Sequence, residues 1–226
     1  MSSRLRWKVA QFAELRWWQN YLKKKDKATY YNWKKKYWND LVIKIQDDLI
    51  VSNDSKILDA GCGPAGIFIN YPDHSITAID PLLDDYTNRL PFFEFSDFPK
   101  VNFINSSIEA FNIDEKFDVI FCMNAINHVV DIDKCWDVLL NHLKPNGQLV
   151  VTIDAHNHPI FRKLFAAIPG DVLHPHQYNL EEYIKMLTDR GLSLTRNVKL
   201  KSEFFFDHHL LVMRECENRM LECLNA

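Results

Sequence analysis

Long apolar runs are absent from this chain of 226 residues. No stretch approaches the roughly 18 consecutive apolar residues that a membrane-spanning helix requires. The first eight residues, MSSRLRWK, also lack the apolar segment of a secretory signal peptide. We therefore expect a protein of the cytoplasm with no part in the membrane.

Cysteine is scarce and poorly spaced for structural chemistry. The five cysteines are Cys62, Cys122, Cys135, Cys216 and Cys223, an odd number without a C-x-x-C pair. This pattern argues against a disulfide framework and against a cysteine-based zinc site. We expect reduced thiols that serve mainly as small buried side chains.

Net charge is small, at -3, but it is unevenly distributed. The first 46 residues contain twelve Lys or Arg and three acids, so the remainder of the chain is acidic. A basic arm can bind nucleic acid, although lysines on a helix more often form a solvated face. Apolar positions at three- and four-residue spacing predict two amphipathic helices here, over residues 9–22 and 30–49.

Glycine is also rare, yet three of the six glycines stand together. Gly61, Gly63 and Gly66 have G-x-G-x-x-G spacing and follow an apolar run that ends at Asp59. The next apolar run, residues 75–80, ends at Asp80, where an acid that binds a ribose would stand. This pattern predicts a strand, a glycine loop and a nucleoside-containing ligand.

A dinucleotide is one candidate for that ligand, but two residues argue against it. Asp59 would place a negative charge where the pyrophosphate should bind. Pro64 removes one N–H donor from the loop. A ligand with a positive ammonium or sulfonium group and no phosphate, such as S-adenosylmethionine (SAM), would instead be attracted to Asp59.

The same residues resemble a known family, the class I (Rossmann-like) SAM-dependent methyltransferases of the small "type 11" kind. Residues 59–63, 76–80 and 117–124 are similar to its first, second and fourth motifs, and residues 143–151 to the turn into its fifth strand. The resemblance covers about residues 56–153. Four signals in the right order are far more specific than a lone glycine motif.

This resemblance implies an α/β fold, a three-layer sandwich around a seven-stranded, mostly parallel sheet. The implied strand order is 3-2-1-4-5-7-6, with strand seven antiparallel. We expect residues 1–50 to form an N-terminal helical lid over the cofactor and residues 51–226 to form the methyltransferase domain. Pro72 leaves room only for a short first crossover helix, and residues 192–200 and 204–213 alternate like a closing hairpin.

The resemblance also implies which residues bind SAM. Ser107 stands where the family usually has an acid that accepts from the adenine amine, and a hydroxyl can accept the same bond without charge assistance. The expected cofactor-binding residues are Asp59, Gly61, Cys62, Gly63, Asp80, Pro81, Ser107, Ile108 and Asn124.

Polar residues after the fifth strand are the candidates for the acceptor side. Ligands of parallel sheets bind beyond the carboxyl ends of the strands, and the segment 156–177 leaves one of these ends. It carries two H-x-H pairs, but no cysteine or suitably spaced glutamate accompanies them, so we expect no metal. The candidate substrate-binding residues are Tyr21, Tyr30, His156, His174, His176 and Gln177. The candidate catalytic residues are His128, His174 and His176.

We therefore predict a SAM-dependent methyltransferase that acts on a small polar metabolite. Residues 124–127, Asn-Ala-Ile-Asn, differ from the Asn/Asp-Pro-Pro-aromatic motif of family members that methylate base amines, which makes nucleic acid a less favoured substrate. Two alternatives stay open. One is a methyltransferase that modifies RNA or protein through the basic helices, and the other is a non-catalytic SAM-binding protein. The sequence leaves the oligomeric state open.

Overall fold

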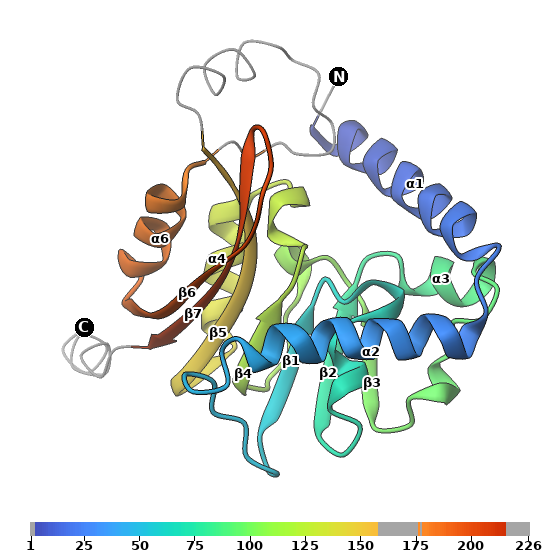
Figure 1. Cartoon of the computed structure of the whole chain (residues 1–226), viewed down its shortest axis with the longest axis horizontal. Helices are drawn as coiled ribbons and strands as arrows, with labels where there is room; N and C mark the ends of the chain where they lie inside the picture. Colours follow the sequence, from blue (N-terminus) through green and yellow to red (C-terminus); the bar gives the residue numbers. More distant parts are fainter. Residues whose placement is uncertain (1–2, 158–175, 177, 216–226) are drawn as a thin grey trace.

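Seven strands form one sheet in the order β3-β2-β1-β4-β5-β7-β6, as predicted (Figure 1). This computed structural model describes residues 3–157, 176 and 178–215. The strands are β1 (Lys56–Ala60), β2 (Ser75–Asp80), β3 (Val101–Asn105), β4 (Phe117–Cys122), β5 (Leu143–His156), β6 (Leu192–Ser202) and β7 (Phe206–Glu215). Strands β1 to β5 are all parallel, and β7 is antiparallel to both β5 and β6.

Both faces of the central strands are buried, which explains their nearly continuous apolar runs. Successive side chains of a strand point to opposite faces. On β1, Ile57 therefore joins one hydrophobic cluster and Leu58 joins the other. Val150 and Val151 of β5 divide in the same way.

Helices cover the two faces and complete the predicted three layers. The α-helices of the described residues are α1 (Ser3–Leu22), α2 (Lys27–Ile43), α3 (Leu83–Arg89), α4 (Ile132–Asn141) and α6 (Leu180–Thr188). Helices α4 and α6 contribute Trp136, Leu139 and Tyr183 to the cluster on one face. Helices α2 and α3 cover the other face, with α2 crossing in front of the strands (Figure 1).

Capping residues define where these helices begin. Asp26 accepts a hydrogen bond from the amide of Thr29 (2.8 Å) at the start of α2. Asn179 and Glu182 form a reciprocal capping box at the start of α6. None of the described helices is both long enough and apolar enough to cross a membrane.

The first crossover contains no α-helix. Two short 3₁₀ turns, η1 (Gly63–Ala65) and η2 (Ile67–Asn70), replace it, so the segment is even shorter than the helix predicted there. Helix α2 packs on these turns: the Trp38 indole donates to Ala65 O (2.9 Å), and the Asn70 amide donates to Lys35 O (3.0 Å). The N-terminal region therefore supplies the layer that a longer crossover helix would otherwise occupy.

A buried glutamine fixes the segment between α2 and β1. The side chain of Gln148 on β5 accepts from the amide of Ile50 (2.7 Å) and donates to Asp48 O (2.7 Å). Both groups of the amide side chain are paired, as burial requires. The start of β1 is thereby tied to the centre of the sheet.

Helix α1 differs most from the sequence prediction. It begins at Ser3, and the periodicity predicted an apolar face that includes Val9 and Phe12. Those two side chains are 44% and 59% exposed, whereas Leu15 and Leu22 are buried. Figure 1 shows the reason, because the first turns of α1 extend away from the sheet.

Candidate functional site

The glycine loop after β1 forms the floor of the candidate site. Gly61 and Gly63 have φ angles of +72° and +57°, which glycine adopts at little cost. A Cβ on Gly61 would stand 2.3 Å from the Cβ of Ala125, so the loop after β4 packs directly on it. The amides of Gly61 and Cys62 both donate to Ile79 O, at 2.8 and 3.0 Å. The ends of β1, β2 and β4 thus meet around this loop.

Asp59 lies beneath the loop and is only 1% exposed. Its Oδ2 accepts from the amide of Phe68 (3.1 Å), which holds the loop closed from inside. Burial raises the pKa of Asp59 to about 7, an effect that its amide hydrogen bonds oppose. We predicted Asp59 as a direct attraction for a positive ligand, but its main contacts here are with the loop backbone.

Asp80, at the end of β2, presents a carboxylate suited to a ribose. Oδ2 accepts from the amide of Gly63 (3.0 Å), and Oδ1 accepts from that of Leu82 (2.9 Å). An ionised carboxylate has about four acceptor positions, so capacity for two ribose hydroxyls is left. Burial, reinforced by the nearby charge of Glu14, raises the pKa of Asp80 to about 7.

Other predicted cofactor residues lie around the same edge. Cys62 is buried, and burial beside Asp59 and Asp80 holds the pKa of its thiol well above the usual range, which makes it a poor nucleophile. Pro81 directly follows Asp80. Ser107 is half-buried and precedes η4 (Ile108–Ala110), in which Ile108 is buried. The apolar side chain of Ile108 suits an adenine ring.

Asn124, at the end of β4, has an unusual backbone conformation. Its φ of +56° lies in the left-handed region, which is uncommon for a residue other than glycine. Thr152 of β5 stabilises it, because its hydroxyl accepts from the Asn124 amide (2.6 Å) and donates to Asn124 Oδ1 (3.0 Å). Such strained positions concentrate at ligand sites.

Helices α1 and α2 lie over the loop. From α1, the Trp18 ring would stand 3.8 Å from a Cβ on Gly63, and Glu14 Oε1 accepts from the Tyr86 hydroxyl (3.4 Å).

Helix α2 also contacts the loop. The Tyr31 hydroxyl donates to Pro64 O (3.4 Å). The ammonium of Lys34 lies 4.7 Å from the Trp38 ring centre, and burial lowers the pKa of Lys34 to about 8 against the opposing charge of Asp59.

The two tyrosines predicted on the acceptor side belong to an aromatic cluster. Tyr30 is buried with its ring 6.2 Å from Tyr21 and 5.8 Å from Phe92. Tyr21 stacks on Trp17 at 4.9 Å and is partly exposed. Tyr21 can therefore reach a ligand more easily than Tyr30.

The predicted histidines that the structure describes have different surroundings. His128 is exposed after β4, in η5 (Ile126–His128). His156 is buried with its ring 4.3 Å from Phe206, and the Nε2 of His176 lies 2.8 Å from Val129 O. Burial lowers the pKa of His176, which favours its neutral form. His174 and Gln177 lie outside the described residues.

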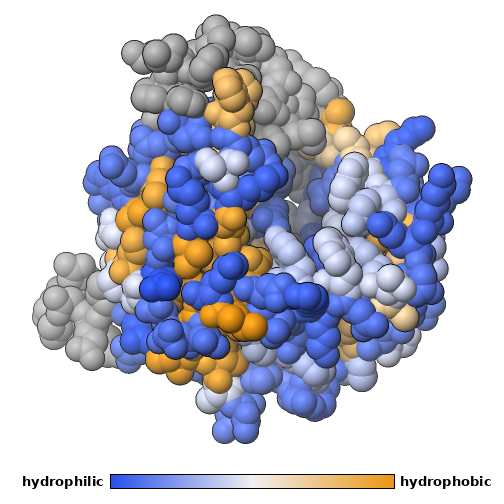
Figure 2. All heavy atoms as spheres, viewed as in Figure 1, coloured by the Kyte–Doolittle hydropathy of each residue, from blue (hydrophilic) through white to orange (hydrophobic). Residues whose placement is uncertain are grey.

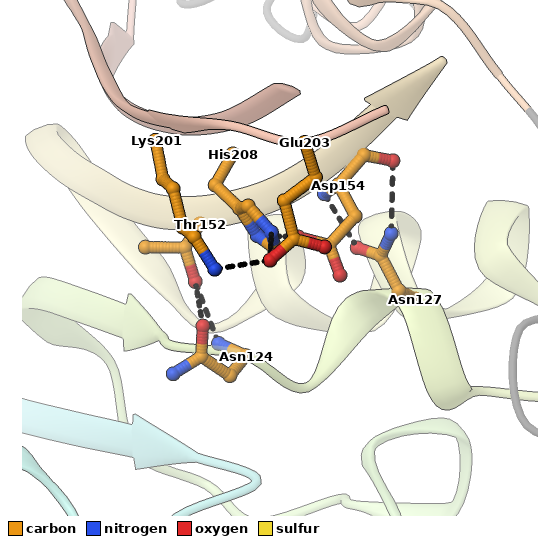
Figure 3. A network of polar contacts seen from close by, with 7 residues as sticks. All are labelled: Asn124, Asn127, Thr152, Asp154, Lys201, Glu203 and His208. Carbon is orange, nitrogen blue, oxygen red and sulfur yellow. Dashed lines mark hydrogen bonds and ion pairs between the residues drawn. The ribbon is translucent and has the colours of Figure 1, made fainter. Parts of the chain in front are cut away.

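The structure adds a polar group that the sequence analysis did not select. Asp154 and His208 are paired across β5 and β7, with Asn127, Glu203 and Lys201 beside them (Figure 3). These residues lie at the same edge as Asn124 and Thr152. The alternating side-chain pattern along residues 204–213 predicted the strand β7. Only the register of β5 with β7 reveals that Asp154 and His208 are paired. In the described part of the chain, His, Cys, Asp and Glu form no cluster of three that could hold a metal ion.

The buried carboxylate of Asp80, the glycine loop and the buried apolar side chain of Ile108 together suit an adenosine moiety. Asp80 supplies acceptors for hydroxyls, and the glycines allow the backbone to approach closely. The loop lacks the free N-terminus of a crossover α-helix, which is the usual pyrophosphate site. These features favour a nucleoside ligand without phosphate.

Comparison with known proteins leads to the same ligand. Residues 30–197 match the family described as Methyltransferase domain. The ubiquinone biosynthesis O-methyltransferase of Rickettsia bellii (strain OSU 85-389) is 30% identical over 116 residues, which cover 50% of this chain and 48% of that protein. The chain thus spans about half the length of the first curated relatives it matches.

Solved structures share the fold at lower identity. An S-adenosylmethionine-dependent methyltransferase from Clostridium acetobutylicum superposes with a TM-score of 0.59 at 20% identity, over 80% of this chain and 92% of that one. The N-methyltransferase NodS from Bradyrhizobium japonicum, solved with S-adenosyl-L-homocysteine, gives 0.57 at 18% identity, over 81% and 86%. With the family match over most of its length and this sheet order, the chain belongs to the class I, Rossmann-like SAM-dependent methyltransferases, and SAM is its cofactor.

Proposed function

We propose that this methyltransferase acts on a small polar molecule. The observation that carries the proposal is the position of half-buried polar side chains beside the cofactor loop. Asp154 and His208 have side chains that are 27% and 30% exposed, and they lie at the edge formed by the carboxyl ends of β4 and β5. Ligands of parallel sheets bind at this edge.

A hollow in the surface also supports a small-molecule acceptor. Figure 2 shows the surface hollowed between α1 and the part of the sheet that carries β6 and β7. The hollow lies on the side of the sheet where α2 crosses the loop. Polar groups in such a hollow favour an acceptor that can pair with them, because buried groups left unpaired cost about 1 to 3 kcal/mol each.

The names of the curated relatives support a small-molecule acceptor. They are named ubiquinone biosynthesis O-methyltransferases. Their similarity to this chain is about 30% identity over roughly half of its length. From these names we infer only that the acceptor is a small molecule, and the experiment below identifies it.

Bound SAM would supply an activated methyl group on a positively charged sulfur. The residues of this chain would hold and shield it: Asp80 the ribose, and Ser107 and Ile108 the adenine. Asn124, fixed by Thr152, would define the wall next to the reacting atoms. Methyl transfer depends mainly on position, with reacting atoms about 3 to 3.5 Å apart, and on exclusion of water.

The test is a transfer assay with radiolabelled SAM on a cell extract that has been separated into metabolite, protein and RNA fractions. We expect label in the metabolite fraction, in a product that mass spectrometry can identify. Label confined to protein or RNA would overturn the proposal. An Asp80→Ala variant is the control, because label that this variant still transfers at the wild-type rate at low SAM concentration does not come from the site described.

The lysines of the N-terminal region are the feature that an RNA-modifying enzyme would use. Two of them pair with acids: Lys27 with Asp97 (2.7 Å) and Lys36 with Asp40 (2.8 Å). Lys34 lies over aromatic rings. RNA binding that weakens steeply with salt would favour this alternative over the small-molecule proposal.

A further inference from the structure

Seven residues at the carboxyl edge of the sheet form a connected set, which we name the edge cluster (Figure 3). They are Asn124, Asn127, Thr152, Asp154, Lys201, Glu203 and His208. At its centre, His208 Nδ1 pairs with Asp154 Oδ1. The antiparallel register of β5 and β7 places these two residues directly opposite each other, so their side chains share one face.

Asp154 is held in place from the β4 side. The Asn127 side chain donates to Asp154 O (3.1 Å) and accepts from the Asp154 amide (3.3 Å). This double contact fixes the strand at the point where the carboxylate meets the imidazole. A carboxylate that accepts from Nδ1–H selects the tautomer in which Nε2 carries the free electron pair.

The His208 side chain is 30% exposed, so a ligand can approach its imidazole. In the described part of the chain, the ion-pair partner of Nε2 is Glu203 Oε1 at 3.6 Å, which is longer than a hydrogen bond. Glu203 pairs with Lys201 instead. The charged groups near His208 are thus Asp154 on β5, Lys201 on β6 and Glu203 in the turn, with the Lys199–Asp207 pair close by.

The edge cluster continues to the cofactor loop. Thr152 precedes Asp154 by two residues on the same face of β5, which corresponds to about 7 Å along a strand. The hydroxyl of Thr152 is bonded to Asn124, and the neighbouring Ala125 packs against Gly61. Thr152, Asn124 and Ala125 therefore connect the strand that carries Asp154 to the loop.

We propose that His208 is the general base of the reaction and that the acceptor is a hydroxyl group. This inference rests on the proposed function, whose substrate class it narrows. The acceptor donates its O–H to Nε2, and the O–H bond breaks as the proton passes to the imidazole. The oxygen electron pair forms the new bond to the methyl carbon, while the carbon–sulfur bond breaks and its electrons stay on sulfur. The imidazolium, stabilised by Asp154, later releases its proton to water.

A hydroxyl acceptor explains why a base stands here. Even a phenol has an ordinary pKa of about 10, so it stays protonated at neutral pH and reacts slowly without a base. An aromatic amine is uncharged at neutral pH, has a free electron pair and needs no proton removal before attack. A histidine oriented by a carboxylate is the arrangement that activates hydroxyl groups in other enzymes.

The first experiment compares His208→Gln with the adjacent His209→Gln as a matched control. His209 belongs to the same strand but faces the other side of the sheet, where its Nδ1 lies 2.8 Å from Asn197 Oδ1. For His208→Gln, we expect kcat/KM for the acceptor to fall at least about 100-fold and to lose its decline toward acidic pH. SAM affinity, measured by calorimetry, should change less than about 2-fold. His209→Gln should keep the wild-type pH profile.

The second experiment needs no turnover. Nitrogen-15 NMR of the imidazoles in the cofactor-free protein should show His208 as the Nδ1–H tautomer, and Asp154→Asn should reduce the population of this tautomer. This measurement also covers the case in which His208→Gln fails to fold.

Three results would overturn the inference: an Nε2–H tautomer in the wild type, a wild-type pH profile in His208→Gln, or a product methylated on nitrogen or sulfur. The last result would leave the proposed function intact, whereas label found only in protein or RNA would refute the proposed function itself.

Discussion

The carboxylate of Asp59 lies so close to Gly66 that a Cβ on this glycine would stand 2.3 Å from Oδ2. Cys62 O would be 2.7 Å away. Neither neighbour is the end of a flexible chain, because Asp59 is buried and Cys62 O is backbone. We expect Gly66→Ala to lower the free energy of unfolding by about 1 to 3 kcal/mol, measured in urea, and to weaken SAM binding.

Gly63→Ala provides the comparison for that variant. A Cβ there meets only the Trp18 ring, at 3.8 Å, and the cost comes from the positive φ. This cost is about 1 kcal/mol. Equal destabilisation by the two substitutions would mean that Asp59 does not enclose Gly66 as described.

Asp80 should make stability depend on pH in the cofactor-free protein. Burial raises the pKa of Asp80 to about 7 from an ordinary 3.8, so the folded state binds more protons than the unfolded state between these values. The contribution to stability is complete below pH 4 and is lost as pH rises through about 7. Asp59 has a pKa raised in the same direction and adds to the effect. Asp80→Asn should therefore flatten the dependence of the unfolding free energy on pH, measured between pH 4 and 8.

The same residue should govern cofactor binding. Asp80→Ala removes charged acceptors for the ribose hydroxyls and should weaken SAM binding by about 1.5 to 3 kcal/mol in calorimetry. NADH should give no binding heat with the wild type. Unchanged SAM affinity in the variant would remove Asp80 from the cofactor site.

Helix α1 is the part of the N-terminal region that we propose as a lid. Trp18 covers Gly63, and Glu14 lies near Asp80, whereas α2 belongs to the hydrophobic core through Trp38 and Leu41. Removing residues 1–22 should leave a folded protein that unfolds cooperatively but has lost turnover. Trp18→Ala should lower kcat/KM, while Phe12→Ala, at a position 59% exposed, should not. Normal turnover in the truncated protein would refute the lid.

Thr152→Val tests the support of Asn124. The substitution keeps the shape of the side chain but leaves the Asn124 amide without its 2.6 Å partner. We expect a loss of about 1 to 3 kcal/mol in the free energy of unfolding and a lower kcat. Asn124→Gly in the same background should recover part of the stability, because glycine adopts the positive φ freely. No recovery would indicate that the hydroxyl contributes by another route.

The sheet could be predicted from sequence because its signals are local. Ile57 and Ile76 begin apolar runs that end at Asp59 and Asp80, and parallel strands bring such ends to one edge. The family resemblance then supplied the strand order. The position of Asp80 beside Gly63 follows from these two facts alone.

The pair of Asp154 and His208 could not be predicted in this way. These residues are 54 positions apart, and a shift of one residue in the register of β5 with β7 would turn one side chain to the opposite face. Nor does the periodicity of α1 reveal that Val9 and Phe12 are exposed. The sequence also does not reveal that the His176 imidazole contacts the backbone oxygen of Val129.

Gln148 has a consequence for how the chain folds during synthesis. Its contacts with Asp48 and Ile50 span 100 and 98 positions, so the segment between α2 and β1 cannot gain this anchor until β5 has been translated. Until then, α2 can pack on η1 and η2, but the segment that follows it is not tied to the sheet by Gln148. A Gln148→Ala substitution should therefore slow refolding and reduce the soluble yield more than its loss in equilibrium stability would suggest.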